Sequence, residues 1–248
     1  MAPLVIAHRG DSAHRPENTL ASFASALELG ADLVELDIQL TRDGAVVVIH
    51  DPTLERTTSG RGDIRQMELR EVRAVSAGFP SRFGAAYAGE RVPTLPEVLG
   101  FVRDRARVMV EIKPDSVTDD AESGIEARAV EQVRRAGMEG DVAFLSFSRR
   151  ALLRCRALAP EIARGHLFYR AEADEVLAGA REVASDLVMP EKGMLSEDLR
   201  DRAREAGLKV ATWVVDDPAE LPALARFELY GIGSNRPGVL LDAIRDGG

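Results

Sequence analysis

Three carboxylates in two apolar segments have the spacing of a metal site. Glu35 and Asp37 lie two residues apart in the segment 32–38, and Glu111 lies in the segment 107–112. Because side chains alternate along a strand, Glu35 and Asp37 would share one face while their apolar neighbours take the other. Carboxylates crowded on one face repel each other unless a cation or a structural ion-pair network compensates them. With no thiol or histidine cluster beside them, these oxygens favour Mg²⁺, Ca²⁺ or Mn²⁺ over zinc.

Two histidines and two cationic side chains are placed to work with such a metal. His8 ends the first apolar run and Arg9 follows it, while His50 follows a later apolar run. Lys113 lies two residues after Glu111 and would share its face of the strand. Two imidazoles beside a metal suit phosphoryl transfer, one as general base and the other as general acid. A planar arginine suits a phosphate. Either histidine could take the proton.

An Asp43-Gly44 pair offers a way to bring His50 to the carboxylates. An Asp-Gly pair between two apolar runs predicts a β-hairpin with a two-residue turn. Here the hairpin would join the strand that carries Asp37 to the segment 45–49. In that register Asp37 pairs with His50, so we expect His50 beside the metal site.

These candidate residues belong to a chain in which short β-rich runs alternate with helical patterns. The predicted parallel strands are 4–8, 32–38, 107–112, 142–147, 162–168, 186–189, 209–215 and 229–233. The predicted helices are 19–29, 95–104, 121–135, 149–158, 173–182, 196–205 and 218–225. Strands separated by helices predict parallel pairing, and barrels built this way carry their active sites at the carboxyl ends of the strands. We therefore predict an α/β fold, a TIM (β/α)8 barrel, with an open doubly wound sheet as the alternative.

The length of the chain favours a single domain, residues 1–248. A (β/α)8 barrel needs roughly 250 residues, and no linker rich in Pro, Gly or Ser divides the 248 residues. One segment, about 51–92, is longer than an ordinary connection and has no strong strand pattern. We expect it to form a small insertion at the barrel mouth, after the β-hairpin that follows the second strand.

The charge balance and the single cysteine limit the classes of partner and compartment. The 32 basic and 41 acidic residues give a net charge of −9, which argues against sequence-independent nucleic-acid binding but not against a small anion at a metal. No apolar run approaches the roughly 18 residues of a stable membrane span. Cys155 has no partner for an intramolecular disulfide, so we expect it to pack and the protein to be cytoplasmic. No pattern predicts an oligomeric state.

Several ordered motifs resemble the glycerophosphodiester phosphodiesterase family, in its bacterial, cytoplasmic type. They run almost from end to end of the chain, and they are specific as a set although each alone is weak. The motifs are His8-Arg9-Gly10, Pro16-Glu17-Asn18-Thr19, Glu35-Leu36-Asp37, Thr41-Arg42-Asp43-Gly44, His50-Asp51, Leu54-Glu55-Arg56-Thr57-Thr58, Val92-Pro93-Thr94-Leu95, Glu111-Ile112-Lys113, Ser146-Phe147-Ser148, Thr212-Trp213-Val214-Val215-Asp216-Asp217 and Ser234-Asn235-Arg236-Pro237. The chain departs from the family pattern where Trp213 precedes Val214-Val215-Asp216 in place of Thr-Val-Asn.

The resemblance implies a metal-dependent enzyme that hydrolyses glycerophosphodiesters, such as glycerophosphocholine and glycerophosphoethanolamine, to glycerol 3-phosphate and an alcohol. It implies one divalent cation, Mg²⁺ or Ca²⁺ with Mn²⁺ as an alternative, and a small-molecule substrate. The residues carried over by motif are the metal ligands Glu35, Asp37 and Glu111, the acid–base pair His8 and His50, the phosphate contacts Arg9 and Lys113, the pocket residue Trp213, and Asn18, which would contact substrate or cap the following helix.

Other functions compete with this interpretation. A lysophospholipase D-like enzyme would need an apolar trough, which Phe79, Phe83 and Tyr87 could supply unless they pack in the core. A pseudoenzyme would bind a phosphorylated ligand without turnover, but both histidines and all three carboxylates are retained. An aldolase-type barrel would need a Schiff-base lysine, and Lys192 and Lys209 are not evidently placed for one.

Overall fold

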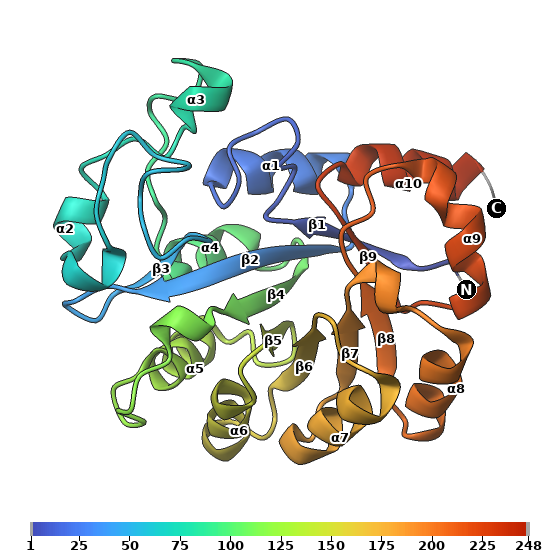
Figure 1. Ribbon diagram of the computed structural model, residues 1–248. Coiled ribbons are helices and arrows are strands. Elements are labelled where there is room, and N and C mark those ends of the chain that lie inside the picture. Colours follow the sequence, from blue (N-terminus) through green and yellow to red (C-terminus); the bar gives the residue numbers. More distant parts are fainter. Residues whose placement is uncertain (1, 247–248) are drawn as a thin grey trace.

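Eight parallel strands close into a barrel within residues 2–246, the residues that the computed structural model describes (Figure 1). Each strand pairs with the next around the barrel, and β1 pairs with both β9 and β2 to complete the ring. The strands are β1 (Leu4–His8), β2 (Leu33–Leu40), β4 (Arg107–Ile112), β5 (Val142–Ser146), β6 (Ala163–Phe168), β7 (Leu187–Pro190), β8 (Lys209–Thr212) and β9 (Gly231–Ser234). The predicted TIM barrel is confirmed, and the open sheet that was its alternative is wrong.

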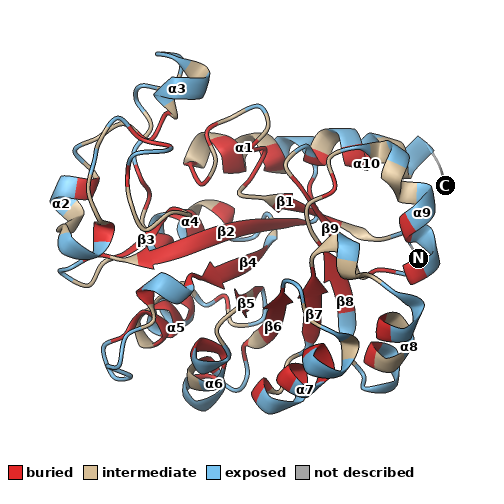
Figure 2. Cartoon of the chain, in the orientation of Figure 1, coloured by how far each residue is buried: buried red, intermediate tan, exposed pale blue. Residues whose placement is uncertain are grey.

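Helices cover the outside of the barrel, so the strands themselves are buried (Figure 2). They are α1 (Leu20–Leu29), α4 (Leu95–Val102), α5 (Ile125–Ala136), α6 (Arg149–Leu158), α7 (Ala173–Val183), α8 (Glu197–Glu205), α9 (Leu221–Leu224) and α10 (Pro237–Asp246), with the 3₁₀ turns η2 (Pro114–Ser116), η3 (Lys192–Met194), η4 (Pro218–Glu220) and η5 (Ala225–Phe227). The sequence prediction lacks α10, which begins at a proline, a residue favoured in a first helical turn. Of the helices in residues 2–246, none combines the length and the apolar character that crossing a bilayer requires.

The second strand shows why acidic side chains point into the barrel. Val34, Leu36 and Ile38 of β2 are buried in the apolar layer between the strands and the helices α4 and α5. The residues between them, Glu35 and Asp37, therefore project to the interior. Apolar side chains fill the rest of that interior: Ile6, Leu33, Met109, Leu145, Leu167, Leu187, Met189 and Ala211.

The hairpin after β2 has a different register from the predicted one. β2 pairs antiparallel with β3 (Val46–Val48). Ile49, and not His50, lies opposite Asp37, because the Ile49 N–H donates to the Asp37 carbonyl at 3.0 Å. The prediction that Asp37 pairs with His50 is wrong by one residue.

A loop of three residues, instead of two, causes this shift. The Thr41 N–H donates to the Ala45 carbonyl at 3.0 Å, and the Gly44 N–H donates to the Thr41 carbonyl at 3.0 Å. Gly44 has a φ of 81°, the left-handed conformation that ends such loops and that glycine adopts without steric cost. The Thr41 hydroxyl stabilises the loop by donating to Asp43 at 2.6 Å and accepting from the Ala45 N–H at 2.8 Å.

Residues 49–93 leave the barrel after β3 and form an insertion. Its elements are η1 (Ile64–Gln66), α2 (Leu69–Val72) and α3 (Pro80–Phe83), and Figure 1 shows α2 beyond the carboxyl end of β2 and α3 at the top, well away from the strands. The insertion packs around a small apolar cluster of Val47, Ile49, Leu54, Ile64, Val72, Ala77 and Val92. Because β3 contributes to that cluster, the hairpin joins the insertion to the barrel.

Leu36→Ala should lower the free energy of unfolding by about 2–5 kcal/mol, because a fully buried leucine leaves a cavity between the barrel and its helices. Leu29→Ala is the control: that side chain is 41% exposed, so the loss should be below about 1 kcal/mol. Urea denaturation of both variants measures the two values. Equal losses would contradict the packing described for β2.

Candidate active site

The carboxyl ends of the strands surround an open cavity whose two walls differ in character. The polar wall contains His8, Arg9, Glu35, His50, Glu111 and Lys113. The apolar wall contains Leu145, Phe147, Leu167, Met189 and Trp213. A concave, partly apolar cavity with a few convergent polar groups has the form of a small-molecule site, and it opens at the end of the barrel where such enzymes carry out chemistry.

Glu35, Asp37 and Glu111 meet at the polar wall. One carboxylate oxygen from each residue lies within 4.8 Å of the other two, and all three side chains are buried. The strand register produces this arrangement: β2 and β4 pair in parallel with Asp37 beside Glu111, and Glu35 shares the inner face of β2 with Asp37. The structure therefore brings together the three residues that the sequence predicted as metal ligands.

Three buried carboxylates this close oppose each other's ionisation. Burial and the charges of Asp37 and Glu111 raise the pKa of Glu35 well above its ordinary value. Burial and the charge of Asp37 also raise the pKa of Glu111, to about 7. Asp37 differs: although burial opposes its ionisation, the Arg9 and Lys113 cations hold its pKa below the ordinary range. The cluster therefore centres on one firmly ionised group, Asp37.

The oxygens of this cluster fit a hard divalent cation. Asp37 Oδ1 is buried and accepts no hydrogen bond from any residue in the described range 2–246, and Lys113 Nζ is 3.4 Å from it. A buried carboxylate oxygen without a donor is costly unless a cation compensates it. Mg²⁺ and Ca²⁺ prefer oxygen ligands such as these. The acidic cluster could therefore bind a divalent metal.

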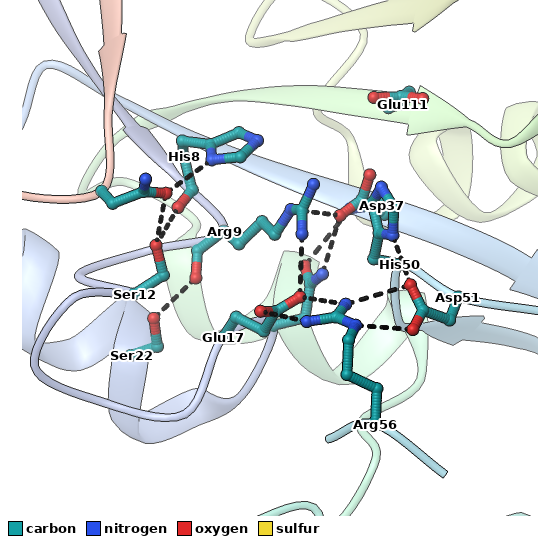
Figure 3. A network of polar contacts seen from close by, with 12 residues as sticks. His8, Arg9, Ser12, Glu17, Ser22, Asp37, His50, Asp51, Arg56 and Glu111 are labelled. Atoms are coloured by element: carbon teal, nitrogen blue, oxygen red, sulfur yellow. Dashed lines mark hydrogen bonds and ion pairs between the residues drawn. The ribbon is translucent and has the colours of Figure 1, made fainter. Parts of the chain in front are cut away.

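Arg9 occupies a strained turn directly after β1. Its φ is 57°, a left-handed conformation that costs free energy for a residue other than glycine. Three contacts hold this backbone: the Arg9 N–H donates to Glu35 Oε2 at 3.0 Å, and the Arg9 carbonyl accepts from the Ser22 hydroxyl at 2.6 Å and from the Asn18 N–H at 3.1 Å. The guanidinium then lies between Glu17 Oε1, 2.9 Å from its NH1, and Asp37 Oδ2, 3.1 Å from its Nε (Figure 3).

His8, the last residue of β1, is oriented by polar groups that follow β8 and β9. Its Nδ1 is 2.7 Å from Asn235 Oδ1, and the Asn235 amide nitrogen donates to Asp216 Oδ2 at 2.8 Å. Because that nitrogen faces Asp216, the Asn235 oxygen accepts from His8 Nδ1–H, which leaves Nε2 as the proton-accepting atom. Burial and the neighbouring Arg9 charge lower the pKa of His8 to about 4, so its imidazole is neutral.

His50 has a carboxylate partner where His8 has an amide. Its Nδ1 is 2.6 Å from Asp51 Oδ1 (Figure 3). Burial opposes ionisation of Asp51, but hydrogen bonds from Arg56 and His50 hold its pKa below the ordinary value. His50 Nδ1 therefore donates to a carboxylate, which leaves Nε2 as the ring nitrogen that can accept or release a proton. Although the hairpin register differs from the prediction, His50 still lines the same cavity as His8.

Lys113 and Asn18 both contact the carboxylates. Lys113 Nζ donates to Glu111 Oε1 at 2.6 Å. Asn18 Nδ2 donates to Asp37 Oδ2 at 2.8 Å, and its Oδ1 accepts from the Asp37 N–H at 3.3 Å. The helix-cap alternative for Asn18 is wrong, because Thr19 caps α1 by accepting an N–H from the first turn.

Trp213 and its neighbours give the apolar wall a defined shape. The indole Nε1 donates to the Met189 carbonyl at 3.1 Å. The indole ring meets the Phe147 ring edge to face, with 6.0 Å between centroids. Leu145 and Leu167, on β5 and β6, extend the same wall. An indole held by a hydrogen bond and an aromatic contact keeps one orientation toward the cavity.

The cysteine and the aromatic side chains of the insertion lie outside the cavity. Cys155 is buried in the apolar layer, where burial raises the pKa of its thiol to about 12, in agreement with the predicted packing role. Phe79, Phe83 and Tyr87 of the insertion meet edge to face. These three rings, all within the described residues, are not part of the cavity wall.

Four residues that hold the reactive side chains have no role in the sequence prediction. They are Glu17, Asp51, Asp216 and Asn235. Asp51, Asp216 and Asn235 follow a strand by at most four residues, and that position is the signal that could have identified them. Glu17 lies nine residues after β1, shortly before α1.

Comparison with known proteins finds similar sequences. A sequence model of the Glycerophosphoryl diester phosphodiesterase family matches residues 8–239. A glycerophosphodiester phosphodiesterase of Caldanaerobacter subterraneus subsp. tengcongensis is 36% identical to this chain over 249 residues, and the match covers 100% of both chains.

Solved structures show the same likeness. A phosphodiesterase of Oleispira antarctica, in complex with the product sn-glycerol-3-phosphate, has a TM-score of 0.89 and 31% identity, covering 98% of this chain and 97% of its own. A glycerophosphodiester phosphodiesterase of Agrobacterium tumefaciens has a TM-score of 0.83 and 30% identity, covering 97% of this chain and 99% of its own.

Mg²⁺ or Ca²⁺ should stabilise the protein, because a cation relieves the repulsion among Glu35, Asp37 and Glu111. At about 100 times its Kd, a ligand contributes about 2.7 kcal/mol, which for a chain of this size raises Tm by roughly 5–10 °C. Glu111→Gln should reduce that rise, whereas Glu161→Gln, an exposed carboxylate on the outer surface, should not. Scanning calorimetry with and without EDTA measures the rise in Tm for the wild type and both variants. A wild-type Tm that is unchanged by the cation would contradict the metal site.

Proposed function

Because the chain belongs to the glycerophosphoryl diester phosphodiesterase family, we propose that it hydrolyses small glycerophosphodiesters, such as glycerophosphocholine and glycerophosphoethanolamine. The chain is an enzyme that cleaves phosphodiester bonds of this class. The products would be glycerol 3-phosphate and an alcohol. The Oleispira antarctica structure, which holds sn-glycerol-3-phosphate as a product, supports that choice.

One observation carries the proposal: two imidazoles, two cations and a buried acidic cluster converge on one cavity. The imidazoles and the cations answer the three needs of phosphodiester cleavage. The diester is an anion, its attacking hydroxyl must lose a proton, and its leaving alcohol must gain one. General acid–base groups meet the last two needs, and cationic groups meet the first.

His8 and His50 are the proposed acid–base pair. Each has its Nδ1 engaged, by Asn235 and by Asp51, so that Nε2 is the atom that exchanges a proton with substrate. One Nε2 would accept the proton of the attacking hydroxyl, from water or from the glycerol of the substrate. The other would donate a proton to the departing alcohol. The proton then lies on the opposite ring, and the pair would reset by exchange with solvent or, where the glycerol hydroxyl attacks, in a second step in which water opens the cyclic phosphate with the two roles reversed.

Glu35, Asp37 and Glu111 are the proposed ligands of one divalent cation, Mg²⁺ or Ca²⁺ with Mn²⁺ as an alternative. When bound, the cation would polarise a phosphoryl oxygen and stabilise the negative charge that develops on it. Arg9 and Lys113 would bind the remaining phosphate oxygens, because both line the cavity beside the carboxylates. Trp213 would line the side of the pocket that holds uncharged substrate atoms. Asn18 would act indirectly, because its amide holds Asp37.

Purified protein should release glycerol 3-phosphate from glycerophosphocholine and glycerophosphoethanolamine, and EDTA should abolish that release. Add-back of Mg²⁺, Ca²⁺ or Mn²⁺ in turn identifies the metal that restores activity best. Lysophosphatidylcholine, assayed in parallel for choline release, tests a lysophospholipase D-like activity, for which the aromatic rings of the insertion offer no cavity wall. If none of the diesters turns over with any cation, the proposal fails and the result favours a phosphate-binding pseudoenzyme.

His8→Ala and His50→Ala should each lower kcat by about 10²–10⁴-fold while the far-ultraviolet circular dichroism stays unchanged. His14→Ala is the control, because His14 is a histidine 52% exposed and outside the cavity. A substrate with an acidic aryl leaving group needs little protonation, so the variant lacking the general acid should keep most of its activity on it. Near-wild-type kcat in either cavity variant would remove that histidine from the mechanism.

The remaining proposals concern location and partners. We propose a cytoplasmic location on the basis of the single, buried cysteine, and a small molecule as the only substrate class, since the net charge of −9 opposes nucleic-acid binding. The chain would work as a single domain over residues 1–248, with the insertion as part of it.

A further inference from the structure

We infer that Arg56, on the insertion, is a positioning residue that orients two site residues at once: His50 through Asp51, and Arg9 through Glu17. This inference rests on the proposed function for the roles of His50 and Arg9. It goes further by giving the insertion a part in the reaction, although Arg56 itself does not line the cavity.

The Arg56 guanidinium binds two carboxylates with both edges of its planar fork (Figure 3). Its Nε and NH2 donate to Asp51 Oδ2 and Oδ1, at 2.6 and 3.0 Å. Its NH1 and NH2 donate to Glu17 Oε2 and Oε1, each at 2.9 Å. Two bidentate pairs on one guanidinium leave little freedom to either carboxylate.

Each of these carboxylates also holds one residue of the cavity. Asp51 Oδ1, which accepts from Arg56, is 2.6 Å from His50 Nδ1. Glu17 Oε1, which also accepts from Arg56, is 2.9 Å from Arg9 NH1. In each carboxylate, therefore, a single oxygen bonds both to Arg56 and to a residue of the cavity. A rotation of either carboxylate would turn the imidazole or the guanidinium attached to it.

The chemistry of this link requires arginine. A lysine ammonium is a point charge with no planar fork and would reach one carboxylate in place of two. Without the Arg56 cation between them, the Asp51 and Glu17 carboxylates would repel each other. Each would also attract its remaining partner, His50 or Arg9, more strongly. Arg9 would then be drawn from Asp37 toward Glu17, since it already contacts both.

A purely structural role is the alternative, because Arg56 also joins the insertion to the segment before α1. The chain offers a matched control for that role. Arg73, at the end of α2, joins the insertion to α4 by donating to both oxygens of Glu97, at 2.6 and 2.7 Å. Its side chain is 38% exposed, against 40% for Arg56, but Glu97 caps a helix and does not contact a site residue.

The test compares Arg56→Gln, Arg56→Lys and Arg73→Gln in the full-length protein. Three quantities are measured: kcat and KM on glycerophosphocholine with a divalent cation, the Kd of sn-glycerol 3-phosphate by calorimetry, and Tm. We expect Arg56→Gln to lower kcat about 10- to 100-fold, because misplacing a reacting group by an ångström costs that much, and to raise both KM and Kd. Arg73→Gln should lower Tm comparably but change kcat and Kd by less than about twofold.

Double variants separate the two branches. If Arg56 acts on His50 through Asp51, Arg56→Gln should lose most of its effect on kcat in an Asp51→Asn background, and most of its effect on Kd in a Glu17→Gln background. Arg56→Lys should recover Tm but only part of kcat, and it replaces Arg56→Gln if that variant does not fold.

Two results would overturn the inference. The first is a kcat and Kd for both Arg56 variants that match those of Arg73→Gln. The second is an effect of Arg56→Gln on kcat and Kd that is as large in the Asp51→Asn and Glu17→Gln backgrounds as in the wild type. Absence of turnover in the wild type would instead refute the proposed function, and the comparison of product affinities would still decide the role of Arg56.

Discussion

The buried negative charge of Asp37 organises the surrounding site. Asp37 is fully buried, and it lies beside Glu111 because the parallel pairing of β2 and β4 puts them in register. A carboxylate in that position must be compensated, and Asn18, Arg9 and Lys113 all contact it. Those contacts fix the turn after β1 and the end of β4, and His8 precedes that turn. The need to compensate the buried charge of Asp37 thus explains the positions of most residues of the polar wall.

The two histidines illustrate two ways of supporting an imidazole. His8 donates to the amide oxygen of Asn235, and the carboxylate of Asp216 orients that amide. His50 donates directly to the carboxylate of Asp51. A carboxylate stabilises a protonated ring more than an amide does. The pair is therefore electrostatically unequal, as the opposite roles proposed for the two rings require.

Much of this molecule follows from local rules, and the rest depends on contacts that a sequence does not display. The alternation of β2 predicted that Glu35 and Asp37 face inward, because strand periodicity is a property of the backbone. The hairpin register was wrong, because the choice between a two- and a three-residue loop depends on how the Thr41 side chain bonds within it. The Asn235–Asp216 pair joins residues that follow neighbouring strands, and only the closed barrel brings them to His8. No local sequence pattern predicts α10 clearly, because its formation depends mainly on packing against the barrel.

The division of the cavity into two walls also divides the chain. Every residue of the polar wall precedes position 114, and every residue of the apolar wall follows position 144. The charged groups therefore belong to the first half of the gene product, and the surface that an uncharged part of a substrate would meet belongs to the second. Substitutions in the second half can reshape that surface without disturbing the charge balance around Asp37. For evolution or for design, the shape of this apolar surface is therefore adjustable separately from the ionic groups of the barrel.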